Sequence, residues 1–368
     1  MSISISRKTF LVLSALLAMS QPAFAEKPKT PDPLFPTSPY LQDKKADFVY
    51  PRVAGDFLVY SQRKGGEFSV VRISKKTPAM SSRTVEPTMR QEAIRFGTAI
   101  ADGSIGYVSD RMGPISAWLR QAKGDGHIAI ANMGTFTGGL MPMSLHASDN
   151  GKIMCFDSPT EKTRRADILN DYPNTSIHEE LLGQNWRMYN SDAYRTKMLY
   201  TSTKAGFRNT FFPPSLFLFD RSSSQLTMIP NAFDGAISPD GSKIAFVREN
   251  DGNYDIWVQG IDGSNLIQLT SSEYGDFDPA WSPDSKNIAF VSNRDSKGEV
   301  LQTSVYIISL ANGKITRITN AQKATDGGPA WLDTDTLVFH SNRDPARPQE
   351  KTISNWNIWK ADIKGALK

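Results

Sequence analysis

Acidic residues recur at fixed places in the second half of the chain. Four aspartates lie either two or four residues ahead of a repeated alanine: Asp234, Asp276, Asp278 and Asp326. Carboxylate oxygens are the ligands that hard cations such as calcium prefer, and they also attract basic side chains. If the repeats surround an axis, equivalent positions lie in a ring, and the acids then form a metal site or a site for a basic segment of a protein partner. The alternative is that each acid is a solvated residue at the start of a strand.

Other residue types with catalytic potential lack the spacing that chemistry needs. The four histidines do not show the His-Glu-x-x-His pattern of zinc enzymes: His127, His146, His178 and His340. The chain has no Gly-x-Ser-x-Gly elbow, which serine hydrolases of the α/β type use, and no glycine-rich phosphate loop. Binding is therefore favoured over catalysis.

Three segments repeat one short pattern, a polar turn followed by an apolar run that ends near an aromatic residue. Residues 240–247 read DGSKIAFV, residues 284–291 read DSKNIAFV, and residues 333–340 read DTDTLVFH. Weaker copies lie upstream, and the aligned aromatic residues are 44–49 positions apart: Tyr60, Tyr107, Phe156, Tyr200, Phe246, Phe290 and Phe339. This period fits one four-stranded propeller blade. The sequence predicts an all-β fold, a single β-propeller of four-stranded antiparallel blades, with seven blades and with six as the alternative.

The N-terminus has the order of a secretory signal peptide. Arg7 and Lys8 precede an apolar run over residues 10–19, which is too short to span a bilayer, and residues 23–25 (AFA) form a cleavage site. Residues 1–25 are thus predicted to be removed, residues 26–46 to be a proline-rich lead-in that supplies a closing strand, and residues 47–368 to be the propeller. Removal of the signal lowers the net charge from +4 to +2, which gives no electrostatic case for nucleic acid, and no later segment is apolar enough to span a membrane.

Several finer expectations follow from the repeat. The last blade has no clear fourth strand, so a segment within residues 34–49 should complete it, and Phe246 and Phe290 should be buried. The tryptophans at repeat positions should pack between blades. Residues 177–182 resemble a helical turn. The Ser-Asn-Arg-Asp stretches at 292–295 and 341–344 are either hairpin turns or a means of presenting arginine to an acidic partner.

The repeat resembles that of the TolB-type β-propellers. The resemblance rests on residues 237–246 (ISPDGSKIAF), 280–294 (AWSPDSKNIAFVSNR) and 339–344 (FHSNRD), and it weakens towards residue 47. It implies a propeller, but the same repeat is also found in propellers of prolyl-oligopeptidase-type enzymes and of polysaccharide lyases. TolB itself has an α/β domain ahead of a six-bladed propeller, and the short lead-in here leaves no room for that domain.

The function expected from these features is a periplasmic, non-enzymatic β-propeller that binds or scaffolds protein partners of the cell envelope. The alternative is a propeller enzyme, a lyase or hydrolase, that acts on an extracellular polysaccharide or peptide with a metal at the channel mouth. Histidines and acids that converge there with shifted pKa values would favour the enzyme.

Overall fold

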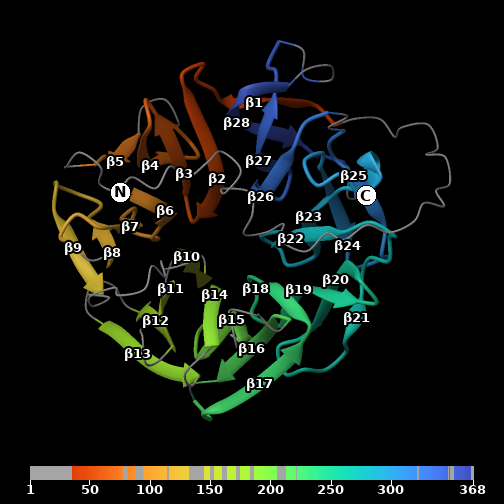
Figure 1. Ribbon diagram of the computed structural model, residues 1–368, viewed down its shortest axis with the longest axis horizontal. Coiled ribbons are helices and arrows are strands. Elements are labelled where there is room, and N and C mark those ends of the chain that lie inside the picture. Colours follow the sequence, from red (N-terminus) through yellow and green to blue (C-terminus); the bar gives the residue numbers. More distant parts are fainter. Residues whose placement is uncertain are drawn as a thin grey trace.

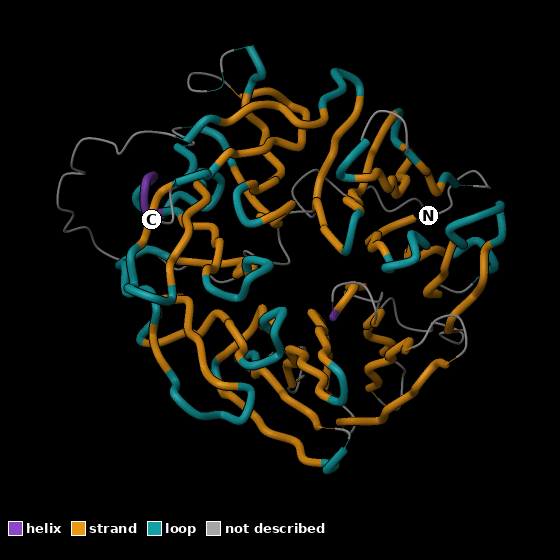
Figure 2. The backbone as a smooth tube through the Cα atoms, turned by 180° about the vertical axis from the view of Figure 1, so that it is seen from behind, coloured by secondary structure: helices purple, strands orange, loops and turns teal. Residues whose placement is uncertain are grey.

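The computed structural model is a ring of β-sheets around a central opening (Figure 1), and the view from behind has the same outline (Figure 2). It describes residues 35–365 except 78–81, 88–93, 114–115, 132–144, 150–152, 160–163, 171–174, 183–185, 205–212, 221, 321–322, 347 and 349–351. The predicted signal peptide and residues 26–34 of the predicted lead-in lie outside the described residues. In the described part, no helix is long and apolar enough to cross a membrane.

The described strands form seven four-stranded sheets, which we call blades 1 to 7 in chain order. Blade 1 holds β2 (Ala46–Ala54), β3 (Phe57–Lys64), β4 (Glu67–Ser74) and β5 (Arg83–Val85), and blade 2 holds β6 (Ile94–Ala99), β7 (Ile105–Ser109), β8 (Ser116–Arg120) and β9 (His127–Ala131). Blade 3 holds β10 (Leu145–Ser148), β11 (Ile153–Pro159), β12 (Arg164–Asn170) and β13 (Thr175–Leu182), and blade 4 holds β14 (Trp186–Tyr194), β15 (Lys197–Lys204), β16 (Ser215–Asp220) and β17 (Gln225–Pro230). The first strand of each sheet is the inner one, nearest the opening in Figure 1.

The remaining three sheets come from the part of the chain with the strongest repeats. Blade 5 holds β18 (Ala232–Ile237), β19 (Lys243–Asn250), β20 (Asn253–Gly260) and β21 (Ile267–Gln268), and blade 6 holds β22 (Asp276–Trp281), β23 (Asn287–Ser292), β24 (Ser304–Ser309) and β25 (Ile315–Arg317). Blade 7 holds β26 (Asp326–Asp333), β27 (Thr336–Arg343), β28 (Thr352–Asp362) and, from the other end of the chain, β1 (Thr37–Leu41). A 3-10 turn, Arg294–Ser296, follows β23.

Strand β1 supplies the outer strand of the last blade. It runs antiparallel to β28, with Thr37 opposite Ala361 and Pro39 opposite Trp359. The expectation that a segment within residues 34–49 closes the ring holds for its first part only. From Ala46 onwards the segment is instead the inner strand of blade 1.

The aligned aromatic residues all lie on the second strand of a sheet, which explains their spacing. Phe246 and Phe290 are both 0% exposed, as predicted. The prediction of a helical turn at residues 177–182 was wrong, because this stretch belongs to strand β13 and pairs with β12. Its apolar residues alternate poorly with polar ones, and pairing with a neighbouring strand decided the local structure.

Tryptophan side chains join neighbouring blades, as expected from their repeat positions. The indole Nε1–H of Trp281 donates to the carbonyl oxygen of Ala236 in blade 5 at 2.9 Å, and Trp331 donates to Ala280 in blade 6 at the same distance. Both rings are buried. A buried indole needs a partner for its N–H, so each of these contacts fixes the inner strand of one blade against the next.

Candidate functional site

The inner strands share an irregularity that places side chains at the centre of the ring. In β2, β18, β22 and β26 the antiparallel register shifts by way of a bulge halfway along the strand. At each of these four bulges one residue has a left-handed backbone: Tyr50 (φ 55°), Asp234 (φ 50°), Asp278 (φ 53°) and Gly328 (φ 54°). Asp and Gly tolerate this conformation better than most residues. The repeated aspartates Asp234 and Asp278 therefore belong to bulges of adjacent blades.

Asp278 interacts with residues of blade 1, although blade 7 lies between blade 1 and blade 6. Burial raises the pKa of the Asp278 carboxyl, and the Gly328 N–H and the Arg52 charge act in the opposite direction. Burial lowers the pKa of Arg52 to about 10, against the influence of Tyr50 and Asp278. Burial and the Asp278 charge also raise the pKa of the Tyr50 hydroxyl. These groups belong to sheets that are not neighbours, so their interaction runs across the wall of blade 7.

Two glycines of β26 make room for this arrangement. A Cβ atom on Gly327 would lie 2.8 Å from Nε2 of His340, and one on Gly328 would lie 3.0 Å from the same ring. The His340 ring meets the rings of Tyr50 and Trp356 edge to face, with 5.3 Å between centroids in each case. The absence of side chains at the two glycines lets the imidazole occupy this part of the wall.

Burial makes His340 a neutral group. It lowers the pKa of the imidazole to about 4, and Nδ1 is buried without a hydrogen-bond partner among the described residues. A base with such a low pKa holds a proton poorly at neutral pH. The channel wall therefore combines one carboxylate, one guanidinium, a phenol and a neutral imidazole, named here the channel cluster: Asp278, Arg52, Tyr50 and His340.

The other two predicted acids are not on the channel wall. The carboxylate of Asp276 accepts two hydrogen bonds from Nη2 of Arg294, at 2.8 and 2.7 Å, and its side chain is 0% exposed. Asp326 accepts from Nε of Arg343 at 3.1 Å and from Nη2 of the same residue. Both members of this second pair are fully buried. These two carboxylates are already neutralised inside blades 6 and 7.

The expected ring of four acids is thus divided in two, and this corrects the sequence interpretation. Asp276 and Asp326 stabilise blades from within, whereas Asp234 and Asp278 lie at inner-strand bulges. Within the described ranges, no group of three or more His, Cys, Asp and Glu side chains comes together that could hold a metal ion. The calcium site stays a prediction, and it now rests on Asp234 and Asp278.

The Ser-Asn-Arg-Asp stretches lie where β23 and β27 end, and their turn chemistry is present: the Ser292 hydroxyl accepts from the Arg294 N–H at 3.3 Å, and the Ser341 hydroxyl accepts from the Arg343 N–H at 3.2 Å. Their arginines have a further role that the sequence did not predict. Arg294 and Arg343 point into their own blades and lie over aromatic rings, 4.8 Å from the centroid of Tyr306 and 5.5 Å from that of Trp359. A sequence signal was present, because blades 6 and 7 have both the acid and the arginine. Blade 5 has Ala232 and Asn250 at the same two repeat positions.

Asp192 is a buried acid that the repeat did not reveal. Its carboxylate accepts from the Ser148 hydroxyl at 2.6 Å and from the backbone N–H groups of Ala193 and Ile237, both at 2.8 Å. These contacts tie blades 3, 4 and 5 together near the opening. Burial raises the pKa of this carboxyl, and the three hydrogen bonds act against the rise. The other repeats have no aspartate at this position, so no pattern marks it.

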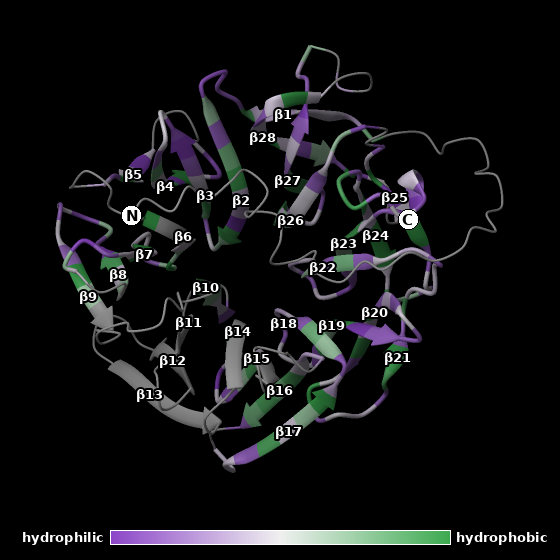
Figure 3. Cartoon of the chain, viewed as in Figure 1, coloured by the Kyte–Doolittle hydropathy of each residue, from purple (hydrophilic) through white to green (hydrophobic). Residues whose placement is uncertain are grey.

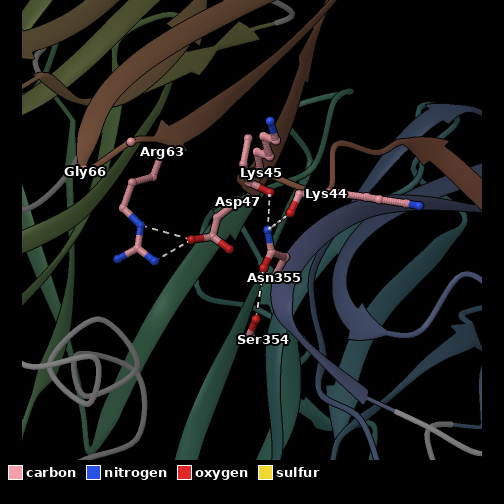
Figure 4. A pocket seen from close by; sticks show the side chains of 9 residues that line it. Lys44, Lys45, Asp47, Arg63, Gly66, Ser354 and Asn355 are labelled. Carbon is pink, nitrogen blue, oxygen red and sulfur yellow. Dashed lines mark hydrogen bonds and ion pairs between the residues drawn. The ribbon is translucent and has the colours of Figure 1, made fainter.

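A second polar site lies where the two ends of the ring meet. Figure 4 shows a hollow of about 290 Å³ between the start of β2, the β3–β4 turn and the start of β28. We call it the seam hollow; it is lined by Lys44, Lys45, Ala46, Asp47, Arg63, Gly65, Gly66, Ser354 and Asn355. Asp47 accepts from Nε of Arg63 at 2.9 Å and from the backbone N–H of Trp356 at 3.1 Å.

The four-stranded sheets arranged around a central opening form a β-propeller. A sequence profile described as the TolB beta propeller domain matches residues 214–305. A relative from Anaeromyxobacter dehalogenans (strain 2CP-C), named Tol-Pal system protein TolB, is 38% identical over 78 residues, which is 20% of this chain and 17% of the relative's length. The chain is similar to TolB propellers over this segment, which is less than a fifth of that relative's length.

Solved structures support the fold. The β-propeller domain of the Trilobed protease from Pyrococcus furiosus superposes with a TM-score of 0.61 at 12% identity, covering 87% of this chain and 96% of that domain. Oligogalacturonate lyase in complex with manganese gives a TM-score of 0.50 at 10% identity, covering 91% and 99%. At such identities the likeness concerns the fold alone.

Proposed function

We propose that the protein is a periplasmic, non-enzymatic propeller that binds a protein partner of the cell envelope through the channel wall. The observation that carries this proposal is the placement of Asp234 and Asp278 at equivalent bulges of adjacent inner strands. Its TolB-type repeats and the Tol-Pal assignment of its relative support a partner-binding role. The signal-peptide pattern of the N-terminus supports export.

The chemistry of the channel cluster favours a basic group as the partner's contact. Burial raises the pKa of Asp278 more than Arg52 and the Gly328 N–H lower it, so a further positive group beside it would favour the ionised carboxylate. A lysine or arginine side chain brought near Asp234 and Asp278 would be attracted by both carboxylates. Charge complementarity of this kind directs a partner to one face.

The channel cluster gives weaker support to catalysis. His340 is neutral at physiological pH because burial lowers its pKa to about 4, and its ring is packed between Tyr50 and Trp356. A general base works best when its pKa is near the operating pH. The cluster therefore resembles a packed polar wall more than an acid–base pair.

An enzyme is the second candidate, because one observation favours it. Asp278, Tyr50 and His340 have shifted pKa values and lie together at the centre of the ring, which is typical of active sites. One solved structure with a similar fold is an oligogalacturonate lyase in complex with manganese. Incubation of the purified protein with oligogalacturonates and manganese tests this candidate; double-bond formation that is lost in Asp278→Asn would favour it.

The binding proposal is tested by capture of partners from the periplasm. The tagged protein and the double variant Asp234→Asn/Asp278→Asn are compared by quantitative mass spectrometry. Glu273→Gln/Glu299→Gln is the matched control, since both glutamates are exposed and the charge change is the same. We expect the channel variant to capture at least tenfold less of a partner protein that the control variant captures in the same amount as the parent protein. Equal capture by all three proteins would overturn the proposal.

A further inference from the structure

Three arginines meet where blades 1 and 2 adjoin, and we call them the guanidinium cluster: Arg72, Arg83 and Arg120. Arg72 of β4 and Arg83 of β5 are direct partners in the antiparallel pairing of blade 1, so their side chains leave the same face of the sheet. Arg120 of β8 in blade 2 donates through Nη1 to the carbonyl oxygen of Thr84, the residue that follows Arg83. In Figure 3 hydrophilic residues of β4, of β5 and of the turn ahead of β9 lie on the same side of the ring.

The two guanidiniums of blade 1 reach one corner of blade 2. Nη1 of Arg72 donates to the carbonyl oxygen of Gly103, and Nη1 of Arg83 donates to that of Ala122 at 2.7 Å. These acceptors lie close together, because the Ala122 N–H donates to the hydroxyl of Ser104, the residue after Gly103, at 3.0 Å. Arg72 and Arg83 therefore bring their charges to the same place.

Arg83 and Arg120 also meet at one turn. Nη2 of Arg83 donates to the carbonyl oxygen of Gly124, and Nη2 of Arg120 donates to the carboxylate of Asp125 at 3.1 Å. Gly124 and Asp125 are consecutive residues between β8 and β9, and both are exposed. The guanidinium cluster is therefore reached by solvent at this turn.

The described residues leave most of the positive charge of the cluster unmatched. Among them, its one ion pair joins Arg120 to Asp125, whose side chain is 94% exposed, and water weakens such a pair. Burial lowers the pKa of Arg72, the charges of Arg83 and Arg120 lower it further, and Asp102 acts in the opposite direction. The Nε atoms of all three arginines are buried without a hydrogen-bond partner in the described part of the chain. Like charges on directly opposite strand residues are destabilising, so an anion placed here would stabilise the junction.

The guanidinium of Arg72 is held in place before any ligand binds. It lies over the ring of Phe57, 4.6 Å from the centroid. Gly103 makes room for it, since a Cβ atom there would lie 2.8 Å from Nη1 of Arg72, and φ of 89° at this position suits glycine. A positioned donor loses less conformational freedom when it binds a ligand.

We propose that the guanidinium cluster binds a phosphate group at the junction of blades 1 and 2. A phosphate group carries about two negative charges near neutral pH, and its oxygens can accept from several guanidiniums at once. A carboxylate has a single charge, so it would leave more of the cluster unmatched. The phosphate is the inorganic ion or the phosphate group of an ester. The site is separate from the channel cluster, and the inference does not depend on the proposed protein partner.

Isothermal titration calorimetry of the purified protein with inorganic phosphate and with glycerol phosphate, at constant ionic strength, tests the proposal. We expect at least one of the two probes to bind with a dissociation constant of about 1 mM or lower. Arg72→Gln and Arg83→Gln should each weaken binding about tenfold, because each removes donors of charge-assisted hydrogen bonds. Arg195→Gln, which removes an exposed arginine of blade 4, is the matched control and should bind like the parent protein.

The glutamine variants also lose contacts between the blades, so Arg83→Lys is a second variant. It keeps the charge but lacks the guanidinium fork, and we expect it to bind more weakly than the parent protein and to unfold at a similar temperature. Tighter binding of glycerol phosphate than of inorganic phosphate would support the proposal and identify an ester as the ligand.

Three results would overturn the proposal. If neither probe binds the parent protein, the arginines only join the two blades. Acetate that binds as tightly as phosphate would show a site for any anion. Phosphate affinity that is unchanged in both Arg72→Gln and Arg83→Gln would place the ion elsewhere on the protein.

Discussion

The interior of blades 6 and 7 and the channel wall between them use the same side chain in different ways. Asp276 and Asp278 are two residues apart on β22. Asp276 lies inside its blade and is matched by Arg294 of the same sheet. Asp278 lies at the bulge and interacts with Arg52, which belongs to another blade. The bulge places the two side chains in these different environments, because an extra residue in the strand changes the face to which the following side chains point.

The difference teaches where this propeller is free to change. In an ion pair inside a blade, the carboxylate and the guanidinium neutralise each other, so replacing one of them leaves the other buried without a counter-charge. At the wall, burial raises the pKa of Asp278 although Arg52 lies near it, so a positive group from outside would stabilise the ionised carboxylate. Asp276 therefore contributes to the stability of the fold, whereas Asp278, two residues further along the chain, is placed to contribute to recognition.

The largest effect is expected from Asp326→Asn. The change leaves the guanidinium of Arg343, which is 0% exposed, without its counter-charge. Loss of one member of a buried pair typically costs about 3–5 kcal/mol, which urea denaturation would measure. The double variant Asp326→Leu/Arg343→Met should regain most of this loss, because it removes both charges together. A cost below about 1 kcal/mol for the single variant would contradict the assignment of this pair to the blade interior.

A smaller effect is expected from Asp276→Asn. Its partner Arg294 keeps 21% of its side-chain surface exposed, so water can solvate the unmatched charge. The loss of hydrogen bonds to a charged group then costs about 1.5–3 kcal/mol. The same urea series gives the value. An equal or larger cost than that of Asp326→Asn would show that exposure of the arginine does not distinguish the two blades.

The buried imidazole of the channel wall should make the stability of the protein depend on pH. The pKa of His340 is lowered to about 4 in the folded protein, against about 6.5 in an unfolded chain. Between these values the unfolded chain binds the extra proton, so stability falls as the pH decreases from about 6.5 to about 4. His340→Gln lacks this dependence. Its melting temperature should therefore lie further below that of the parent at pH 7 than at pH 5, and a gap that is the same at both pH values would contradict the burial of the imidazole.

The smallest effect is expected from calcium. Asp276 and Asp326 lie inside their blades, so the predicted site has two carboxylates, Asp234 and Asp278, whereas calcium prefers six to eight oxygen ligands. If calcium is at or below its Kd, the stabilisation is less than about 0.5 kcal/mol. Differential scanning fluorimetry with and without the ion measures it, and Asp234→Asn/Asp278→Asn should abolish any rise. A rise that survives in this variant would place the ion elsewhere.

Much of the architecture could be predicted from the chain, for a physical reason. The aligned aromatic residues lie on the second strand of each sheet, and Tyr107, Phe246 and Phe290 are buried in apolar clusters that join two neighbouring blades. The polar turns ahead of them repeat as well. In one, the Ser238 hydroxyl donates to Asp240 at 2.6 Å and accepts from the Lys243 N–H at 2.9 Å. Such contacts are local, and a sequence pattern can carry them.

The site could be predicted only in part. The spacing identified Asp234 and Asp278 as equivalent, but a strand that is treated as regular places Asp276 and Asp278 on the same face. The bulge breaks that rule, and it is not visible in residue types. Arg52 and His340 reach the cluster from blades 1 and 7, and such contacts depend on how sheets close around an axis rather than on any local pattern.

The pairing of Pro39 with Trp359 has a consequence for biosynthesis. Strand β1 is made near the start of translation, and its only partner strand is made near the end. The loop between them is almost the whole chain, and closing so long a loop has a large entropic cost that no local contact offsets. The six blades with local partners can form in order, while blade 7 has to wait for the last strand. Closure of the ring is therefore expected to be the slow, final step of folding, as the high contact order of this pairing requires.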